Sequence, residues 1–345
     1  MDYDQGIKIS AFGEIMLRLK SPGYERLMQS ASLEATYGGS EYNVLASLAQ
    51  FGLRTAMISQ LPDNDIGEAC LREVRSYGIE VEQISRTEAR MGQYYLEAGS
   101  NQRSGKVIYD RENSAFARLQ KSALNWEQIL DDSQWLLVSG ITPALSPDLA
   151  EGTLEAVRVA KAKGLTVAFD FNYRDSLWQQ NELKADEVLG KIVQHVDVLM
   201  ASERDCNICL GIEVGNTSQD GLGRNYNLTE KMFAVYPNLK VMTGTFRDVV
   251  SADYHNLSAG LRDRSGYYVS RNFTMRNIVD RIGAGDAFAA GLIYGLMKNQ
   301  GGQKALDFAT AAFCLKHSIP GDINRVSREE IVALLGGSFI GQVSR

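Results

Sequence analysis

Short apolar segments alternate with longer segments of helical periodicity along most of the chain. Residues 41–51 carry apolar side chains three and four positions apart and end at Gly52, and residues 149–163 behave similarly and end at Gly164. Short apolar runs lie at residues 7–12, 55–61, 135–139, 166–171, 197–201 and 240–243. This alternation predicts the α/β class, with a doubly wound, mostly parallel sheet flanked by helices. Ligands of such sheets bind at the carboxyl ends of the strands.

Two parts of the chain depart from this alternation and predict a second sheet. Residues 14–19 alternate, with Ile15, Leu17 and Leu19 on one face, which is typical of a half-buried strand. Residues 91–96 and 106–109 predict two further strands around a polar turn. We expect a small, discontinuous β sheet that either covers a ligand site as a lid or forms a plain edge. The predicted division is 1–13, 37–87 and 114–345 for the α/β catalytic domain, and 14–36 and 88–113 for the β lid. A surface loop is expected at 216–227.

Composition and charge narrow the class of partner. The 345 residues are 44% hydrophobic and 23% charged, which is ordinary for a globular protein with a large core. The net charge is 36 − 42 = −6, which argues against nucleic acid as a partner. No apolar run reaches membrane-spanning length and the first residues lack a signal-peptide core, so we expect a cytoplasmic protein without a membrane partner.

The cysteines and histidines lack the spacing of a metal site. Cys206 and Cys209 form a single C-x-x-C pair with no second pair and no nearby histidine, so a zinc site is short of ligands. A redox pair is an alternative, but two thiols on a helix face in a reducing cytoplasm are favoured. The three histidines are scattered, and we assign them no role.

The strongest chemical signal lies at residues 280–288, which read Asp-Arg-Ile-Gly-Ala-Gly-Asp-Ala-Phe before a run of small apolar residues. A helix that begins at Gly283, Ala284 and Gly285 presents unpaired N–H groups and a positive dipole end, which together bind anions. Asp286 in that first turn predicts a base beside an anion hole. The structural alternatives are a tight strand-to-helix connection and a simple helix cap.

Other nucleotide and hydrolase motifs are missing. A dinucleotide-binding fold needs G-x-G-x-x-G after an early strand, whereas position 288 is Phe and this motif lies near the C-terminus. The chain has no Walker A sequence and no G-x-S-x-G elbow. The motif therefore favours proton removal from a hydroxyl that attacks a phosphoryl group.

Four further segments place polar groups at predicted strand or helix ends. Two glycines precede a helix whose first turn carries an asparagine; a strand end carries an asparagine and an arginine; a charged string follows a lid strand; and a Thr-Gly-Thr turn follows another strand. Each segment also has a structural alternative. In the same order, these are an N-cap by Ser40, an ion pair of Arg174 with Asp175, a solvated charge cluster and an ordinary turn. The residues are Gly38, Gly39, Asn43, Asn172, Arg174, Arg111, Thr243, Gly244, Thr245 and Arg247.

Together these segments resemble the ribokinase-like (PfkB) carbohydrate kinases over nearly the whole chain. Residues 38–44 resemble the N-terminal signature of that family and residues 280–288 its C-terminal signature. Within the family, residues 109–115 and 170–174 are most similar to 2-keto-3-deoxygluconate kinases. The resemblance implies a ribokinase-like fold and ATP-dependent phosphorylation, with Mg²⁺, of the terminal hydroxyl of a ketodeoxy sugar acid.

The resemblance also implies roles for individual residues. Asp286 is the base, and Gly283, Ala284 and Gly285 form the anion hole. The sugar side comprises Gly38, Gly39, Asn43, Tyr94, Tyr109, Arg111, Asn172, Arg174 and Asp322. The nucleotide side comprises Ser202, Thr243, Gly244, Thr245, Arg247, Gly283 and Gly285.

The chain departs from the family pattern in two places. Ser202-Glu203-Arg204-Asp205 stands where the family has Asn-x-x-Glu, so the metal ligands are undefined and Asp205 is a candidate contact to a metal-bound water. The turn at Thr243-Gly244 lacks the usual Lys-x-Gly-x-x-Gly form. A fructokinase or other neutral-sugar kinase, and a sugar-binding protein of the same fold without turnover, are the alternative functions. A homo-oligomer, with dimerisation through the lid, is the family expectation.

Overall fold

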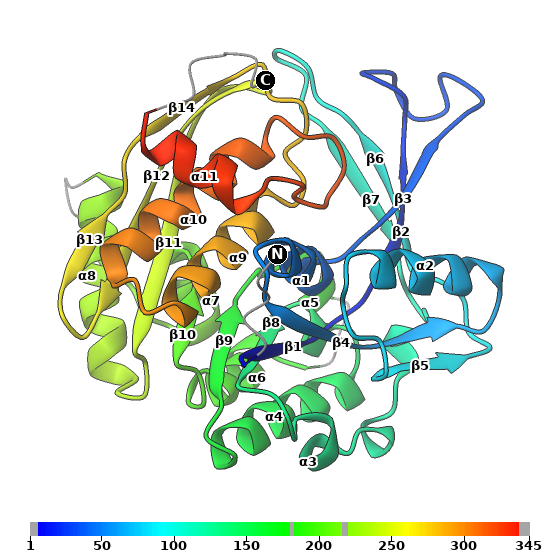
Figure 1. Cartoon of the computed structure of the whole chain (residues 1–345), viewed down its shortest axis with the longest axis horizontal. Coiled ribbons are helices and arrows are strands. Elements are labelled where there is room, and N and C mark those ends of the chain that lie inside the picture. Colours follow the sequence, from blue (N-terminus) through cyan, green and yellow to red (C-terminus); the bar gives the residue numbers. More distant parts are fainter. Residues whose placement is uncertain (1–5, 180–182, 216–219, 338–345) are drawn as a thin grey trace.

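The computed structural model describes residues 6–179, 183–215 and 220–337, and its larger sheet runs through the whole molecule (Figure 1). The strand order is β13-β12-β11-β10-β9-β8-β1-β4-β5, and β14 pairs with β12. Neighbours from β11 to β5 are parallel, whereas β12 pairs antiparallel with β11, β13 and β14. The predicted doubly wound, mostly parallel sheet is confirmed. Its strands are β1 Lys8–Phe12, β4 Arg54–Pro62, β5 Ile84–Thr87, β8 Trp135–Ser139, β9 Thr166–Asp170, β10 Val198–Met200, β11 Val241–Ser251, β12 Tyr254–Asp263, β13 Tyr267–Val269 and β14 Phe273–Arg276.

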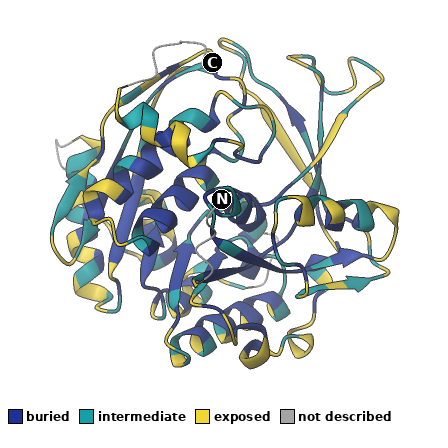
Figure 2. Ribbon diagram, in the orientation of Figure 1, coloured by how far each residue is buried: buried dark blue, intermediate teal, exposed yellow. Residues whose placement is uncertain are grey.

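Helices cover both faces of this sheet and bury two apolar cores against it. One core packs α1 Ser40–Gln50, α2 Asp65–Ser76, α9 Ala284–Met297, α10 Gly302–Lys316 and α11 Arg328–Leu335. The other packs α3 Trp126–Ile129, α4 Pro147–Ala162, α5 Asp175–Trp178, α6 Ala185–Val193, α7 Glu203–Leu210 and α8 Gly221–Val235. Short 3₁₀ turns lie at Phe116–Arg118, Lys121–Ala123 and Thr142–Ala144. Because both faces are covered, β1 is buried along its whole length, and β8, β9 and β10 are buried except at some strand ends (dark blue in Figure 2).

Local sequence accounts for the helix ends that the pattern predicted. Ser146 caps α4 by accepting the backbone N–H of Leu149, and Pro147 occupies the first helical position, where its missing N–H costs nothing. The chain leaves α1 and α4 through Gly52 and Gly164, whose φ angles are 90° and 80°. Such left-handed conformations favour glycine, which is why both helices stop there.

The second sheet has the order β3-β2-β6-β7 and lies beside the carboxyl ends of the main strands (Figure 1). Its strands are β2 Met16–Lys20, β3 Glu34–Gly38, β6 Gln93–Glu97 and β7 Lys106–Asp110. The strands expected at 14–19, 91–96 and 106–109 are confirmed, and β3 is an additional one that its polar sequence did not indicate. Figure 2 shows β3 and β7 largely exposed, as expected for the two edges of a thin sheet.

The inward face of β2 is the reverse of a simple hydrophobic pattern. Met16 and Arg18 are buried, whereas Leu17 and Leu19 are only partly buried. Arg18 pairs laterally with Thr36 of β3 and Tyr94 of β6, so these residues share the inward face. The apolar alternation located the strand correctly, and the face that carries Met16 and Arg18, not the one that carries Leu17 and Leu19, is turned toward the larger α/β part of the molecule.

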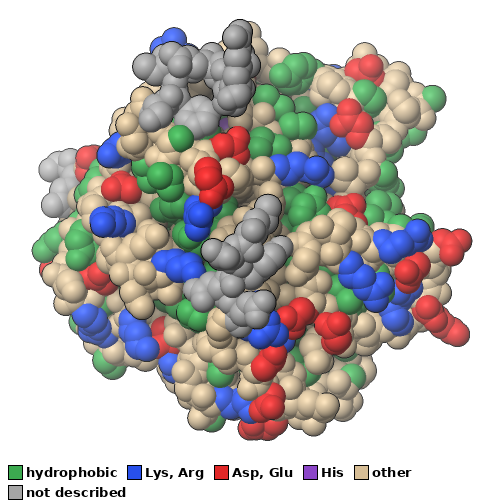
Figure 3. Space-filling view, in the orientation of Figure 1, with side chains coloured by type: hydrophobic (Ala, Val, Ile, Leu, Met, Phe, Trp, Pro, Cys, Tyr) green, Lys and Arg blue, Asp and Glu red, His purple; other side chains and the backbone are tan. Residues whose placement is uncertain are grey.

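Two other expectations need correction or extension. The expected loop at 216–227 is wrong for residues 221–227, which open α8, because Asp220 caps that helix by accepting the backbone N–H of Gly223; residues 216–219 lie outside the described residues. The run at 240–243 is only the start of β11, which continues into a long hairpin with β12. In the part of the chain that the structure describes, no helix has the length and apolarity to cross a bilayer. Charges of both signs are interspersed on the face shown in Figure 3.

Candidate active site

A cavity of about 560 Å³ lies between the lid sheet and the carboxyl ends of the parallel strands. Its walls include Asp170 at the end of β9, Met200 at the end of β10, and Thr243 of β11. The lid contributes Tyr94 and Tyr109. This is where ligands bind in doubly wound sheets, and α9 begins at the same point. Sequence position and fold therefore converge on one site.

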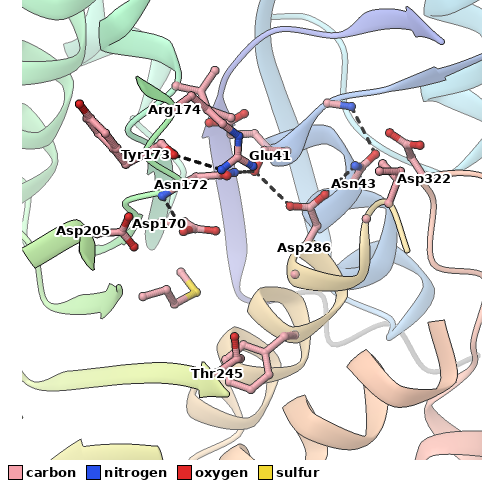
Figure 4. A pocket seen from close by; sticks show the side chains of 18 of the residues that line it. Glu41, Asn43, Asp170, Asn172, Tyr173, Arg174, Asp205, Thr245, Asp286 and Asp322 are labelled. Atoms are coloured by element: carbon pink, nitrogen blue, oxygen red, sulfur yellow. Dashed lines mark hydrogen bonds between the residues drawn. The ribbon is translucent and has the colours of Figure 1, made fainter. Parts of the chain in front are cut away.

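Asp286 lies in the first turn of α9 and faces this cavity (Figure 4). Its two carboxylate oxygens accept hydrogen bonds from Ser40 Oγ at 3.1 Å and from Asn43 Nδ2 at 2.7 Å. The N-cap of α9 is Gly283, with φ 76° and no side-chain cap. Asp286 therefore does not cap its own helix, which removes the structural alternative raised by the sequence.

The start of α9 leaves backbone N–H groups available beside Asp286. Gly283 and Gly285 line the cavity, whereas Ala284 is buried behind them. A Cβ built on Gly283 would lie 1.9 Å from the backbone oxygen of Asp322, so only glycine fits this contact. The first turn of a helix binds anions through its unpaired amides and dipole.

Asn172 connects β9 to the same group of side chains. Its φ of 38° is left-handed, a conformation that Asn tolerates better than most residues. Its Nδ2 donates to Ser40 Oγ at 3.1 Å, so Asn172, Ser40, Asp286 and Asn43 form one chain of hydrogen bonds. Arg174, two residues further on, lines the cavity with an exposed side chain and has no ion-pair partner among the described residues. Asp175, its expected partner, binds Arg204 instead.

Arg111 also lines the cavity, but unlike Arg174 it forms an ion pair within the protein. Its guanidinium donates through Nε to Glu14 Oε2 at 2.8 Å and through Nη2 to the same oxygen. Ser114 Oγ donates to the other oxygen of Glu14. Both side chains of the pair are more than nine-tenths buried, so the charge of Arg111 is compensated inside the protein. Asp322 is likewise engaged, because it accepts hydrogen bonds from Tyr94 and Arg18.

Four carboxyl groups that line the cavity have raised pKa values, and for Asp322, as for the other three, burial is the first cause. Burial raises the pKa of Asp170 to about 7, with further increases from the charges of Asp286 and Asp205. Burial also raises the pKa of Glu41 to about 7. Burial raises the pKa of Asp286 to about 6; hydrogen bonds from Asn43 and Ser40 oppose the shift, and the charge of Asp322 adds to it. Perturbed groups that share a cavity are typical of functional sites.

The predicted nucleotide side also lines the cavity. Ser202, Thr243, Gly244, Thr245 and Arg247 all contribute to its wall. Asp205 does so too, but its carboxylate accepts hydrogen bonds from the backbone N–H of Ser202 at 2.8 Å and from its Oγ at 2.7 Å. This capping box at the start of α7 explains why the sequence reads Ser-Glu-Arg-Asp there.

Most of the residues singled out in the sequence meet at this one cavity. Gly38 is an exception: it lies behind the wall, where an added Cβ would be 2.3 Å from Asp322 Oδ2. Glu14, Ser40, Glu41, Asp170 and Arg281 line the cavity but were not identified from the sequence. Ser40 follows Gly39 directly and Arg281 lies two positions before Gly283, so proximity to a motif was the available signal. The sequence gives no signal for Glu14, because the role of this residue depends on its contact with Arg111, which is 97 positions away.

Fold and site together define an α/β phosphotransferase with an acid-lined cavity at an anion-binding helix start. The family model "pfkB family carbohydrate kinase" matches residues 7–231 and 261–327, and the chain belongs to this family. The match confirms the resemblance drawn from the two signatures, and identifies the protein as a kinase that acts on a sugar hydroxyl.

Individual relatives agree over almost the full length of the chain. A 2-dehydro-3-deoxygalactonokinase of Haloferax volcanii is 31% identical over 97% of this chain and 98% of its own. The crystal structure of a 2-dehydro-3-deoxygluconokinase from Thermotoga maritima is 40% identical, with a TM-score of 0.90 over 96% of this chain and 100% of that one. An Escherichia coli structure assigned as a ribokinase II, in complex with ATP and Mg²⁺, is 18% identical with a TM-score of 0.74, covers 96% of this chain and 99% of its own, and shows the shared fold.

Proposed function

We propose that this protein uses ATP to phosphorylate the terminal hydroxyl of 2-keto-3-deoxygluconate or a close ketodeoxy sugar acid. The observation that carries the proposal is the position of Asp286, which faces the cavity from the first turn of α9 and is held by Asn43 and Ser40. The names of the Haloferax and Thermotoga relatives support the substrate class.

Asp286 acts as the general base in this mechanism. Its pKa of about 6 leaves it mostly ionised at neutral pH, and close enough to neutrality to accept a proton from a hydroxyl. The hydroxyl oxygen attacks the γ-phosphorus of ATP as the bond to the β-phosphate oxygen breaks, with ADP as the leaving group. The unpaired amides at Gly283 and Gly285 stabilise the negative charge on the transferred group.

The nucleotide side supplies cations and donors for the phosphates. Arg247 and Arg281 line the cavity, and neither forms an ion pair within the described ranges of the chain. Two unpaired guanidinium groups on one wall favour a polyanion there. Ser202, Thr243 and Thr245 line the same space, although the hydroxyl groups of Thr243 and Ser202 already donate to Gly260 O and Asp205 Oδ2.

The donor set also fits Mg²⁺. Asp170 and Asp205 line the cavity, and the pKa of Asp170 is raised first by burial and then by the charges of Asp286 and Asp205, while the charge of Arg174 opposes the shift. Mg²⁺ is held by one or two carboxylates, water and substrate phosphates, so two carboxylates suffice. When bound, the ion neutralises the phosphate charge that develops during transfer.

The charges on the sugar side support an acid substrate, with Arg174 as its principal contact. Arg174 has no ion pair among the described residues, whereas Arg111 is paired with Glu14 and contributes a positioned donor with little net charge. A neutral sugar needs no such cation. The compensation of Arg111 is also the observation that favours a neutral-sugar kinase as the second candidate, because it leaves Arg174 as the one arginine on this side without an ion pair in the described part of the chain.

Side-by-side kinetics with 2-keto-3-deoxygluconate and fructose test the proposal. The wild type is expected to prefer the acid, and Arg174→Met is expected to raise KM for the acid by roughly 10- to 100-fold, which is what one charge-assisted hydrogen bond contributes. KM for fructose changes less. Arg75→Met, on the exposed surface of α2, is the matched control. Equal losses for both sugars in Arg174→Met, or preference of the wild type for fructose, contradict the acid assignment.

We also propose that the outward face of the lid supports a homo-oligomer. Leu17, Leu19, Tyr95 and Ile108 share this face according to the strand register, and Ile108 is 52% exposed. Apolar side chains on one exposed face favour association with another apolar surface. Light scattering on the wild type and on Ile108→Lys tests the assembly: the proposal expects a dimer or larger species that Ile108→Lys weakens.

A further inference from the structure

Arg18 is a buried guanidinium that the proposed mechanism does not use. It lies in the middle of β2 with 2% of its side chain exposed, and it does not line the cavity. It donates from Nη2 to Asp280 Oδ2 at 2.5 Å and from Nη1 to Asp322 Oδ1. A buried arginine is costly unless its partners are well placed, so this bridge between two carboxylates calls for a function.

The two carboxylates belong to the two loops that shape the start of α9. Asp280 Oδ1 accepts the backbone N–H of Ile282 at 3.0 Å, directly before Gly283. Asp280 Oδ2 also accepts the backbone N–H of Gly321 at 3.1 Å, in the loop after α10. Asp280 thus holds both loops, and Arg18 holds Asp280.

Asp322 extends the same contact to the anion hole and the sugar side. Its backbone oxygen would be 1.9 Å from a Cβ on Gly283, and its carboxylate would be 2.3 Å from a Cβ on Gly38. The N-cap of α9 therefore rests directly on Asp322. Since Arg18 and Tyr94 both donate to Asp322, the position of this residue is set from two strands of the lid.

The charges in this cluster balance only when Arg18 is counted. Lys316, at the end of α10, is fully buried and donates to the backbone oxygen of Ile319 at 3.1 Å. Burial lowers the pKa of Lys316, while the charges of Asp280 and Asp322 raise it. Arg18 and Lys316 therefore balance the charges of Asp280 and Asp322, and Arg18 is the charged residue that the lid contributes to these four.

We propose that Arg18 is a positioning residue through which the lid sheet sets the geometry of the anion hole and of Asp286. The inference rests on the proposed phosphoryl transfer and adds a coupling between lid and helix start to it. Arg18 contacts neither substrate in this account. It acts through Asp280 and Asp322 on the turn that carries Gly283.

The test compares Arg18→Lys with Lys20→Met, a change on the same strand and face whose native ion pair is with Glu34, a side chain that is 56% exposed. Lysine keeps the charge but cannot span both carboxylates. We expect Arg18→Lys to fold and to lose about 100-fold in kcat, with KM for ATP and for the sugar acid changed by less than about threefold, because a small misplacement of the anion hole acts on the transition state. Lys20→Met keeps the wild-type kcat. A kcat of Arg18→Lys within twofold of the wild type overturns the proposal, as does a loss confined to KM.

A second variant and a second measurement distinguish a positioning role of Arg18 from a general folding defect. Arg18→Met with Asp280→Asn removes one charge of each sign, so the cluster stays neutral, and the same loss of kcat is expected. Hydrogen exchange of residues 279–288 without any substrate should be at least about tenfold faster in both variants than in the wild type and in Lys20→Met. Unchanged exchange contradicts the positioning role. If the wild type phosphorylates no sugar, the proposed function fails, while the exchange experiment still decides the role of Arg18.

Discussion

At the scale of single residues, the site depends on carboxyl groups that the fold keeps partly protonated. Glu41 is 2% exposed, its Oε1 has no hydrogen-bond partner, and Gly13 leaves room for it, since an added Cβ there would be 2.2 Å from Glu41 Oε2. Burial raises its pKa to about 7, and the charge of Asp286 adds to the shift. Ionisation of such a buried carboxyl group at neutral pH lowers the stability of the folded protein. Destabilising groups of this kind are typical of functional sites.

Glu41→Gln measures this cost. The folded-state pKa of about 7 lies above the ordinary value, so the stabilisation gained by protonating Glu41 is complete below about pH 4 and is lost as the pH rises through 7. The stability of Glu41→Gln should therefore rise relative to that of the wild type between pH 4 and 7. The difference in Tm between the variant and the wild type should favour the variant by roughly 3 °C more at pH 8 than at pH 5. Calorimetry against Glu187→Gln, an exposed change on α6, provides the comparison. A Tm difference that does not vary with pH rules out this account of Glu41.

At the scale of elements, the glycines of α9 set how closely it packs on α10. A Cβ on Gly291 would lie 2.7 Å from Ala309 Cα, and one on Gly295 would lie 2.6 Å from Ala305 Cα. Both glycines face a backbone that cannot move aside. The small-residue run read from the sequence as a buried helix is therefore a surface for close helix contact, and it holds α9 in place beneath the cavity.

Matched glycine substitutions test this packing. Gly295→Ala is expected to lower the free energy of unfolding by about 1–3 kcal/mol, because the added methyl overpacks the contact with α10. Gly190→Ala in α6 is expected to raise it by up to about 1 kcal/mol, since its added Cβ meets nothing nearer than Leu210 Cδ2 at 4.0 Å and alanine is the better helix former. Urea denaturation of both variants and of the wild type measures these changes in the free energy of unfolding. Equal effects of the two changes would show that helix propensity, not packing, controls α9.

The elements also show how far the sequence determines the fold. Buried parallel strands and capped helices, such as β9 and α4, were predictable because their patterns are local. β3 and the hairpin of β11 with β12 were not, since their exposed strands have no apolar alternation. The burial of Arg18 on the inward face of β2 was not predictable, because it depends on partners more than 250 positions away, which no local pattern contains.

At the scale of the whole molecule, two signatures far apart in sequence meet at one carboxylate. Asn43 and Ser40 come from the N-terminal signature, and Asp286 comes from the C-terminal one. The resemblance to the kinase family predicted that these regions form one site. It did not predict the pairing of Arg111 with Glu14 or the capping role of Asp205, which depend on how side chains share partners after folding.

The most direct test of the account is the turnover of Asp286→Asn across pH 5–9 with ATP and 2-keto-3-deoxygluconate. The account predicts a folded protein that binds both substrates and loses roughly 10²–10⁴-fold in kcat. In the wild type, kcat/KM should rise with pH through about 6 as Asp286 ionises, and this rise should be absent from the residual activity of the variant. Asp131→Asn, a surface change, controls for the loss of a carboxylate. An Asp286→Asn enzyme within a few-fold of the wild-type kcat contradicts the assignment of this residue as the base.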